Sequence, residues 1–102
     1  MTFTQKEAEA HFSWIFQSAG SEIARSLFAV EASWPEETPS IVFEDAWDTA
    51  LRDLRNGIAA VMLANGVTDQ KMIAKAQEIA VDSFIDRFTA LADAWDAEGG
   101  SA

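Results

Sequence analysis

The chain has 102 residues, 49% of them hydrophobic, and its 17 acidic and seven basic side chains give a formal net charge of −10. This length fits one domain, the hydrophobic content is too high for a disordered acidic tail, and the absence of cysteine excludes disulfides and cysteine-ligated metal sites. The negative charge opposes binding to nucleic acid phosphates and anionic lipids and favours contact with basic surfaces.

The N-terminal residues lack the features of a targeting segment. Lys6, Glu7 and Glu9 occupy the region where a secretory signal would need a positive start followed by an apolar run. The longest uncharged stretches are shorter than the roughly 20 apolar residues that cross a bilayer. We therefore expect a cytoplasmic protein with no membrane partner.

The first helical pattern covers residues 5–33. Thr4 and Glu7 form a capping box at its start. Gly20 costs a helix about 1 kcal/mol relative to alanine, so two alternatives stay open: one continuous helix, or a break at Gly20 and Ser21 that gives four helices in total. The apolar stripe keeps helical spacing across this point. Its members are Phe12, Phe16, Ala19, Ile23, Leu27, Val30 and Trp34.

Residues 33–40 form a loop with two prolines, which disfavour helix at the residues before them. The second helix is predicted to begin between Pro39 and Phe43. Asn56 and Gly57 form a turn dipeptide within it, but the apolar stripe keeps its phase there. That stripe consists of Phe43, Trp47, Ala50, Leu54, Ile58 and Val61.

The third helix is expected after Asn65 and Gly66, which tolerate a left-handed backbone and end the second helix. Thr68 or Asp69 caps it, and residues 99–102 are predicted to be a flexible tail. Its stripe contains Ile73, Ala76, Ala80, Phe84, Leu91 and Trp95. The sequence therefore predicts an all-α fold, an antiparallel up-down-up bundle of three long helices in a single domain spanning residues 1–98.

No catalytic or metal-binding pattern is recognisable. His11 is the only histidine, and the chain has no glycine-rich phosphate loop and no nucleophile motif. The basic residues are scattered among acids, whereas nucleic acid binding needs a basic stripe. We expect a protein that is not an enzyme, carries no metal or cofactor and does not bind nucleic acid directly.

The acidic residues are unevenly distributed along the chain. Residues 26–51 and 88–102 contain no lysine or arginine but hold nine of the 17 acids. In an up-down-up bundle both stretches lie at the same end, and the rest of the molecule has a net charge of −1. We call this end the acidic pole. Its acids are Glu31, Glu36, Glu37, Glu44, Asp45, Asp48, Asp93, Asp96 and Glu98.

Three tryptophans accompany these acids. The sequence Asp-Ala-Trp-Asp occurs at residues 45–48 and again at 93–96, and Trp34 lies in the proline loop. Either these side chains plug the end of the core, which is favoured for Trp47 and Trp95, or they dock on a partner, for which Trp34 is the better candidate. The candidate partner-binding residues are Glu31, Trp34, Glu36, Glu37, Glu44, Asp45, Asp48, Asp93 and Asp96.

A second aromatic face lies opposite the main stripe of the first helix. Phe3, Trp14 and Phe28 share this angle, which a small bundle usually keeps polar. Two interpretations remain open: the first helix has neighbours on both sides, or the three residues form a self-association surface.

The sequence thus predicts a small binding module that occupies a basic surface of a partner protein. Where that surface holds nucleic acid, the module would be an inhibitor that imitates phosphate. It is similar to small acidic phage-encoded inhibitors, including anti-CRISPR proteins, in size and charge only. The alternative is an assembly protein that forms a helical homodimer through Trp14 and Phe28.

Overall fold

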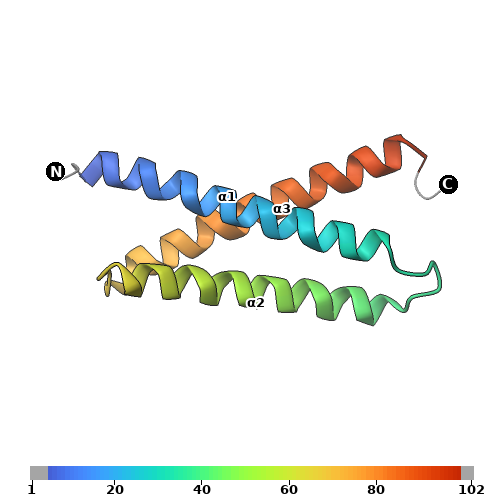
Figure 1. Cartoon of the computed structure of the whole chain (residues 1–102), viewed down its shortest axis with the longest axis horizontal. Helices are drawn as coiled ribbons and strands as arrows, with labels where there is room; N and C mark the ends of the chain where they lie inside the picture. Colours follow the sequence, from blue (N-terminus) through green and yellow to red (C-terminus); the bar gives the residue numbers. More distant parts are fainter. Residues whose placement is uncertain (1–4, 100–102) are drawn as a thin grey trace.

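The computed structural model describes residues 5–99, with side chains from Phe12 onward. It contains three helices, α1 (Gln5–Ala32), α2 (Ser40–Ala64) and α3 (Gln70–Ala97), and no strand in this part of the chain. Helices α1 and α3 run in the same direction and α2 runs opposite to them (Figure 1). The predicted all-α, up-down-up bundle of three long helices is therefore confirmed.

Helix boundaries follow local backbone chemistry. Helix α2 begins directly after Pro39, within the predicted interval, and ends before Gly66, whose φ of 81° suits a residue without a side chain. Helix α3 begins after Asp69, whose side chain accepts a hydrogen bond of 2.9 Å from the backbone N–H of Lys71. The predicted capping box at Thr4 and the tail beyond Gly99 lie outside the described residues.

Helix α1 is continuous through Gly20, so the four-helix alternative is wrong. Gly20 marks the place where α1 crosses α3, because a Cβ atom there would lie 2.1 Å from the carbonyl O of Ala80. Ala24, one turn later, and Ala80 are fully buried. The glycine therefore allows two helix backbones to approach each other closely. Helix α2 is likewise continuous through Asn56 and Gly57.

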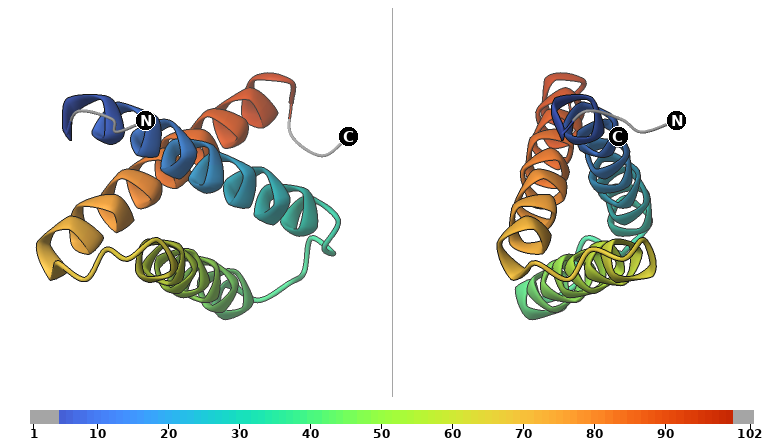
Figure 2. Two further views of the ribbon diagram at one scale, coloured as in Figure 1. Left: turned by 60° about the vertical axis from the view of Figure 1, so that its left-hand side comes forward. Right: turned by 90° about the vertical axis from the view of Figure 1, so that its left-hand side faces the viewer.

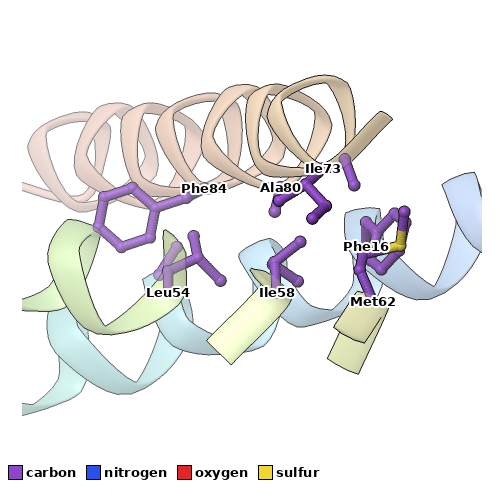
Figure 3. Close-up of a cluster of buried hydrophobic side chains, with 9 residues drawn as sticks. Phe16, Leu54, Ile58, Met62, Ile73, Ala80 and Phe84 are labelled. Carbon is purple, nitrogen blue, oxygen red and sulfur yellow. The ribbon is translucent and has the colours of Figure 1, made fainter. Parts of the chain in front are cut away.

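The molecule is elongated, with extents of 53 × 24 × 17 Å. Seen along its length, the three helices form a triangle (Figure 2). Seen from the side, α1 and α3 cross each other at an angle near their middles (Figure 1). Side chains from all three helices fill the space between them (Figure 3). The buried core comprises Phe16, Ala24, Leu54, Ile58, Met62, Ile73, Ala76, Ala80 and Phe84.

The crossing of α1 and α3 makes the ends of the bundle diverge. At one end lie the C-terminal parts of α1 and α3 and the N-terminal part of α2 (Figure 1). There the C-terminal part of α3 turns away from the start of α2, and both views show these segments well separated (Figures 1 and 2). This end is the acidic pole, and its opening positions the candidate site.

Candidate functional site: an acidic hollow

A hollow of about 550 Å³ opens at the acidic pole where the three helices diverge. Its floor is aromatic and its rim carries three carboxylates. We call it the acidic hollow. It is lined by Glu31 of α1, Phe43, Glu44, Trp47 and Asp48 of α2, and Phe88 of α3.

Helical spacing explains why α2 supplies both floor and rim. Phe43 and Trp47 are four residues apart and form one row on the helix, while Glu44 and Asp48 form the adjacent row. The aromatic row is half-buried and the acidic row is exposed. The divergence of α3 leaves the acidic row uncovered, so the carboxylates face the hollow and remain accessible to solvent.

The other two helices each contribute one residue. Glu31 follows Ala24 by seven residues, two turns of α1, and so lies on the side that faces α3. Phe88 follows the buried Phe84 by one turn of α3. Both side chains are half-buried. Because each continues a row that packs in the core, their positions are fixed by the bundle itself.

The floor is held by edge-to-face aromatic contacts. The ring centroids of Trp47 and Phe88 are 5.0 Å apart with an interplanar angle of 86°, and those of Trp47 and Phe84 are 4.8 Å apart at 64°. Such pairs contribute about 0.5–1.5 kcal/mol each beyond their burial. Trp34 packs on Phe43 in the same way, at 5.1 Å. The floor is therefore a rigid extension of the core.

Among the described side chains, the three rim carboxylates have no basic partner. The ion pairs in the described part of the chain join Arg25 to Glu22 and Arg52 to Asp53, and neither involves the hollow. Burial raises the pKa of Glu31 above its ordinary value. The hollow thus combines a partly desolvated carboxylate with two exposed ones, and the basic side chains of residues 12–99 form no ion pair with them.

The eight acids among the nine predicted partner-binding residues divide into two groups, and the ninth residue, Trp34, does not line the hollow. Glu31, Glu44 and Asp48 meet at the hollow. Five further acids are exposed on segments at the same end of the molecule but do not line it. These are Glu36, Glu37, Asp45, Asp93 and Asp96.

The expected exposure of the tryptophans is wrong for two of them. Trp34 is half-buried because it packs on Phe43, although its place in a proline loop favoured exposure. Trp95 was expected in the core but is 36% exposed. Its ring packs on that of Phe28, with the two centroids 5.9 Å apart. Trp47 is half-buried, as expected from its core stripe.

Two residues of the hollow were not predicted as site residues. Phe43 belongs to the core stripe of α2, and its position one turn before Trp47 could have indicated a shared floor. Phe88 follows Phe84 by one turn. Its place in the hollow depends on where α3 leaves α2, which helical spacing alone does not indicate.

Two residues of the predicted aromatic face of α1 differ in their surroundings. Phe28 is half-buried against α3, with ring centroids 5.7 Å from Phe88 and 5.9 Å from Trp95. Trp14 is 67% exposed, and Phe3 lies outside the described residues. The interpretation that α1 has a neighbour on this side holds at Phe28, whereas self-association through Phe3, Trp14 and Phe28 stays a prediction.

Comparison of the chain with protein-family models, curated proteins and solved structures finds no match. In the described part of the chain no helix is long and apolar enough to cross a membrane. Among the same residues, no group of three or more histidine, cysteine, aspartate or glutamate side chains is arranged to hold a metal ion. That the chain is cytoplasmic, is not an enzyme and carries no cofactor stays a prediction.

Proposed function

We propose that the chain is a protein-binding module whose acidic hollow receives a basic side chain from the surface of a partner protein. One observation carries this proposal. Three carboxylates, those of Glu31, Glu44 and Asp48, surround an aromatic floor, and no basic residue of the described chain pairs with them.

Arginine is the side chain that best suits this hollow. Its guanidinium group is planar and always charged, stacks on aromatic rings and donates paired hydrogen bonds to carboxylates. The hollow offers both features, with Trp47 and Phe88 as rings and the adjacent carboxylates as acceptors. The five exposed acids around it attract a basic surface from a distance and speed the encounter.

An inhibitory role follows where the partner's basic surface normally holds DNA or RNA. The acidic pole would then occupy the place of the phosphates and compete with the nucleic acid. The net charge of −10 and its concentration in two stretches without lysine or arginine support this role. Small acidic phage inhibitors, including anti-CRISPR proteins, provide an analogy of size and charge.

Competition with nucleic acid tests the proposal. The purified chain is titrated into complexes of candidate DNA-binding proteins with fluorescent DNA, and the displaced DNA is measured at several salt concentrations. We expect displacement that weakens as salt rises, because the contact is electrostatic. The hollow variant changes Glu31→Gln, Glu44→Gln and Asp48→Asn together.

A matched control separates the hollow from the overall charge. Glu78→Gln, Asp82→Asn and Asp86→Asn raise the net charge by the same three units at exposed positions of α3 outside the hollow. We expect the control to compete like the wild type and the hollow variant to compete at least about tenfold more weakly, equivalent to about 1.4 kcal/mol. Equal competition by both variants would show that the hollow is not the binding site.

A further inference from the structure

A continuous row of aromatic rings leads from the acidic hollow to the C-terminal end of α3. The ring centroid of Phe88, which lines the hollow, is 5.0 Å from that of Trp47 and 5.7 Å from that of Phe28. Phe28 in turn packs on Trp95, with the two centroids 5.9 Å apart. The three inner rings are half-buried, whereas Trp95 at the outer end is 36% exposed. The aromatic floor of the hollow therefore continues to a second, more accessible tryptophan.

The two ends of this row carry the same tetrapeptide. Asp-Ala-Trp-Asp occurs once in α2 and once in α3. Because both copies are helical, the last aspartate of each lies about 100° around the helix from its tryptophan. In the first copy this pair, Trp47 and Asp48, lines the hollow. The second copy carries the same pair, Trp95 and Asp96, at the outer end of the row, and Asp96 is exposed.

The negative charge at the outer end has no basic partner among the described side chains. The sequence of α3 contains no lysine or arginine after Arg87, and the ion pairs of residues 12–99 involve neither Asp93 nor Asp96. Asp96 lies in the last turn of α3, where the helix dipole disfavours an acid. Helix stability alone would place a basic residue there, so this carboxylate is suited to a cation from another molecule.

We propose that Trp95 and Asp96 form a second subsite, which binds another arginine of the same partner segment. This inference rests on the proposed function of the hollow, and it makes the partner a segment with two arginines rather than one. Trp95 offers a ring on which a guanidinium group stacks, and Asp96 offers an acceptor for its N–H groups. The subsite supplies fewer carboxylates than the hollow, so it acts mainly when the hollow already holds the segment.

The aromatic row limits the spacing of the two arginines. The three steps from ring to ring place the centroids of Trp47 and Trp95 no more than about 17 Å apart, a length that about five residues of extended chain cover. A segment of this length reaches both subsites without further contacts between them. The second contact is then intramolecular and raises the affinity of the whole segment.

Two peptides that differ in one side chain test the second subsite. The first has two arginines separated by four glycines, and in the second one arginine is replaced by citrulline, which has nearly the same length but no charge. Both are titrated into the full chain, and the indole N–H resonances report binding. We expect the two-arginine peptide to bind at least about tenfold more tightly than the single-arginine peptide. It should shift the resonance of Trp95 as well as that of Trp47.

Protein variants show whether this ratio of affinities depends on the second subsite or on peptide charge. Trp95→Ala removes the outer ring, and Trp14→Ala removes an exposed ring outside the row as a control. We expect the ratio to approach one in Trp95→Ala and to keep its wild-type value in Trp14→Ala. Asp96→Asn should also lower the ratio, whereas Asp82→Asn, an exposed change elsewhere on α3, should not. Circular dichroism confirms that each variant is helical, and Asp96→Asn decides the outcome where Trp95→Ala fails to fold.

The outcomes distinguish this inference from the proposed function of the hollow. A single-arginine peptide that leaves the Trp47 resonance unshifted would refute the hollow as a binding site and the second subsite with it. If that peptide binds at Trp47 but the second arginine adds no affinity, the second subsite alone is wrong. A ratio that stays at its wild-type value in both Trp95→Ala and Asp96→Asn would also overturn it, because the gain would then come from peptide charge.

Discussion

Gly20 of α1 and Ala80 of α3 are in such close contact that a Cβ atom on Gly20 would lie 2.1 Å from the Ala80 carbonyl O. No change of side-chain rotamer would relieve this clash, because a Cβ atom is fixed by the backbone of α1 and the Ala80 carbonyl belongs to the backbone of α3. The pair therefore fixes the distance between α1 and α3 at their crossing. The divergence of the helix ends follows from this crossing, and with it the opening of the acidic hollow.

Gly20→Ala should destabilise the protein although alanine is the better helix former. We expect the free energy of unfolding to fall by at least about 2 kcal/mol, because α1 and α3 must separate to admit the methyl group. Gly57→Ala is the control, since no atom lies within 4 Å of its added Cβ, and it should stabilise by up to about 1 kcal/mol. Urea denaturation measures both, and a Gly20→Ala variant as stable as wild type would contradict this account of the crossing.

Trp47→Ala should cost far more stability than Trp14→Ala. Trp47 contacts the rings of Phe84 and Phe88, and removal of such a side chain typically costs about 3 kcal/mol or more. Trp14 is 67% exposed, and its loss should change stability by less than about 0.5 kcal/mol. Thermal unfolding compares the two, and similar losses would show that Trp47 does not anchor the floor of the hollow.

Glu31 should make stability depend on pH in a defined direction. Burial raises its pKa, so the folded chain binds this proton more tightly than the unfolded chain does. The contribution of Glu31 to the free energy of unfolding is therefore most favourable in acid, below the pKa that this carboxyl has in the unfolded chain. That contribution is lost as pH rises through the raised pKa that Glu31 has in the folded chain. Glu31→Gln should consequently be more stable than wild type at neutral pH, and the difference should vanish in acid.

Urea titrations at several pH values measure this difference. Glu78→Gln serves as the control for the change in net charge, because Glu78 is exposed and lies outside the hollow. A stabilisation by Glu31→Gln that is equally large in acid and at neutral pH would show that ionisation of this carboxyl is not its cause.

The fold could be predicted from the sequence because each helix carries a long apolar stripe between strong stop signals. Pro39 directly precedes α2, and Gly66, which has a positive φ, follows its end. Gly20 was ambiguous, because the same residue favours a break in an isolated helix and permits a close crossing in a packed one. Only the neighbouring backbone of Ala80 distinguishes these two roles.

The candidate site was only partly predictable. The charge distribution placed Glu31, Glu44 and Asp48 at one end, and the structure brings these three together. Spacing could not indicate that Phe88 joins them, because its position depends on how far α3 diverges from α2. The exposure expected of Trp34 from its place in the proline loop was wrong, because its contact with Phe43 joins that loop to a helix.

The central claim is that the acidic hollow binds a basic side chain, and the indole N–H resonances of the tryptophans test it most directly. A short peptide of alternating arginine and glycine is titrated into the full chain, with a citrulline peptide of the same length as the uncharged control. Trp47 lines the hollow, whereas Trp14 is an exposed tryptophan outside it.

We predict that the arginine peptide shifts the Trp47 resonance in a saturable manner and leaves Trp14 unchanged. The citrulline peptide should have no effect, and the response should be lost in the variant that combines Glu31→Gln, Glu44→Gln and Asp48→Asn. Equal shifts of Trp14 and Trp47, or an unchanged response in this variant, would contradict the claim.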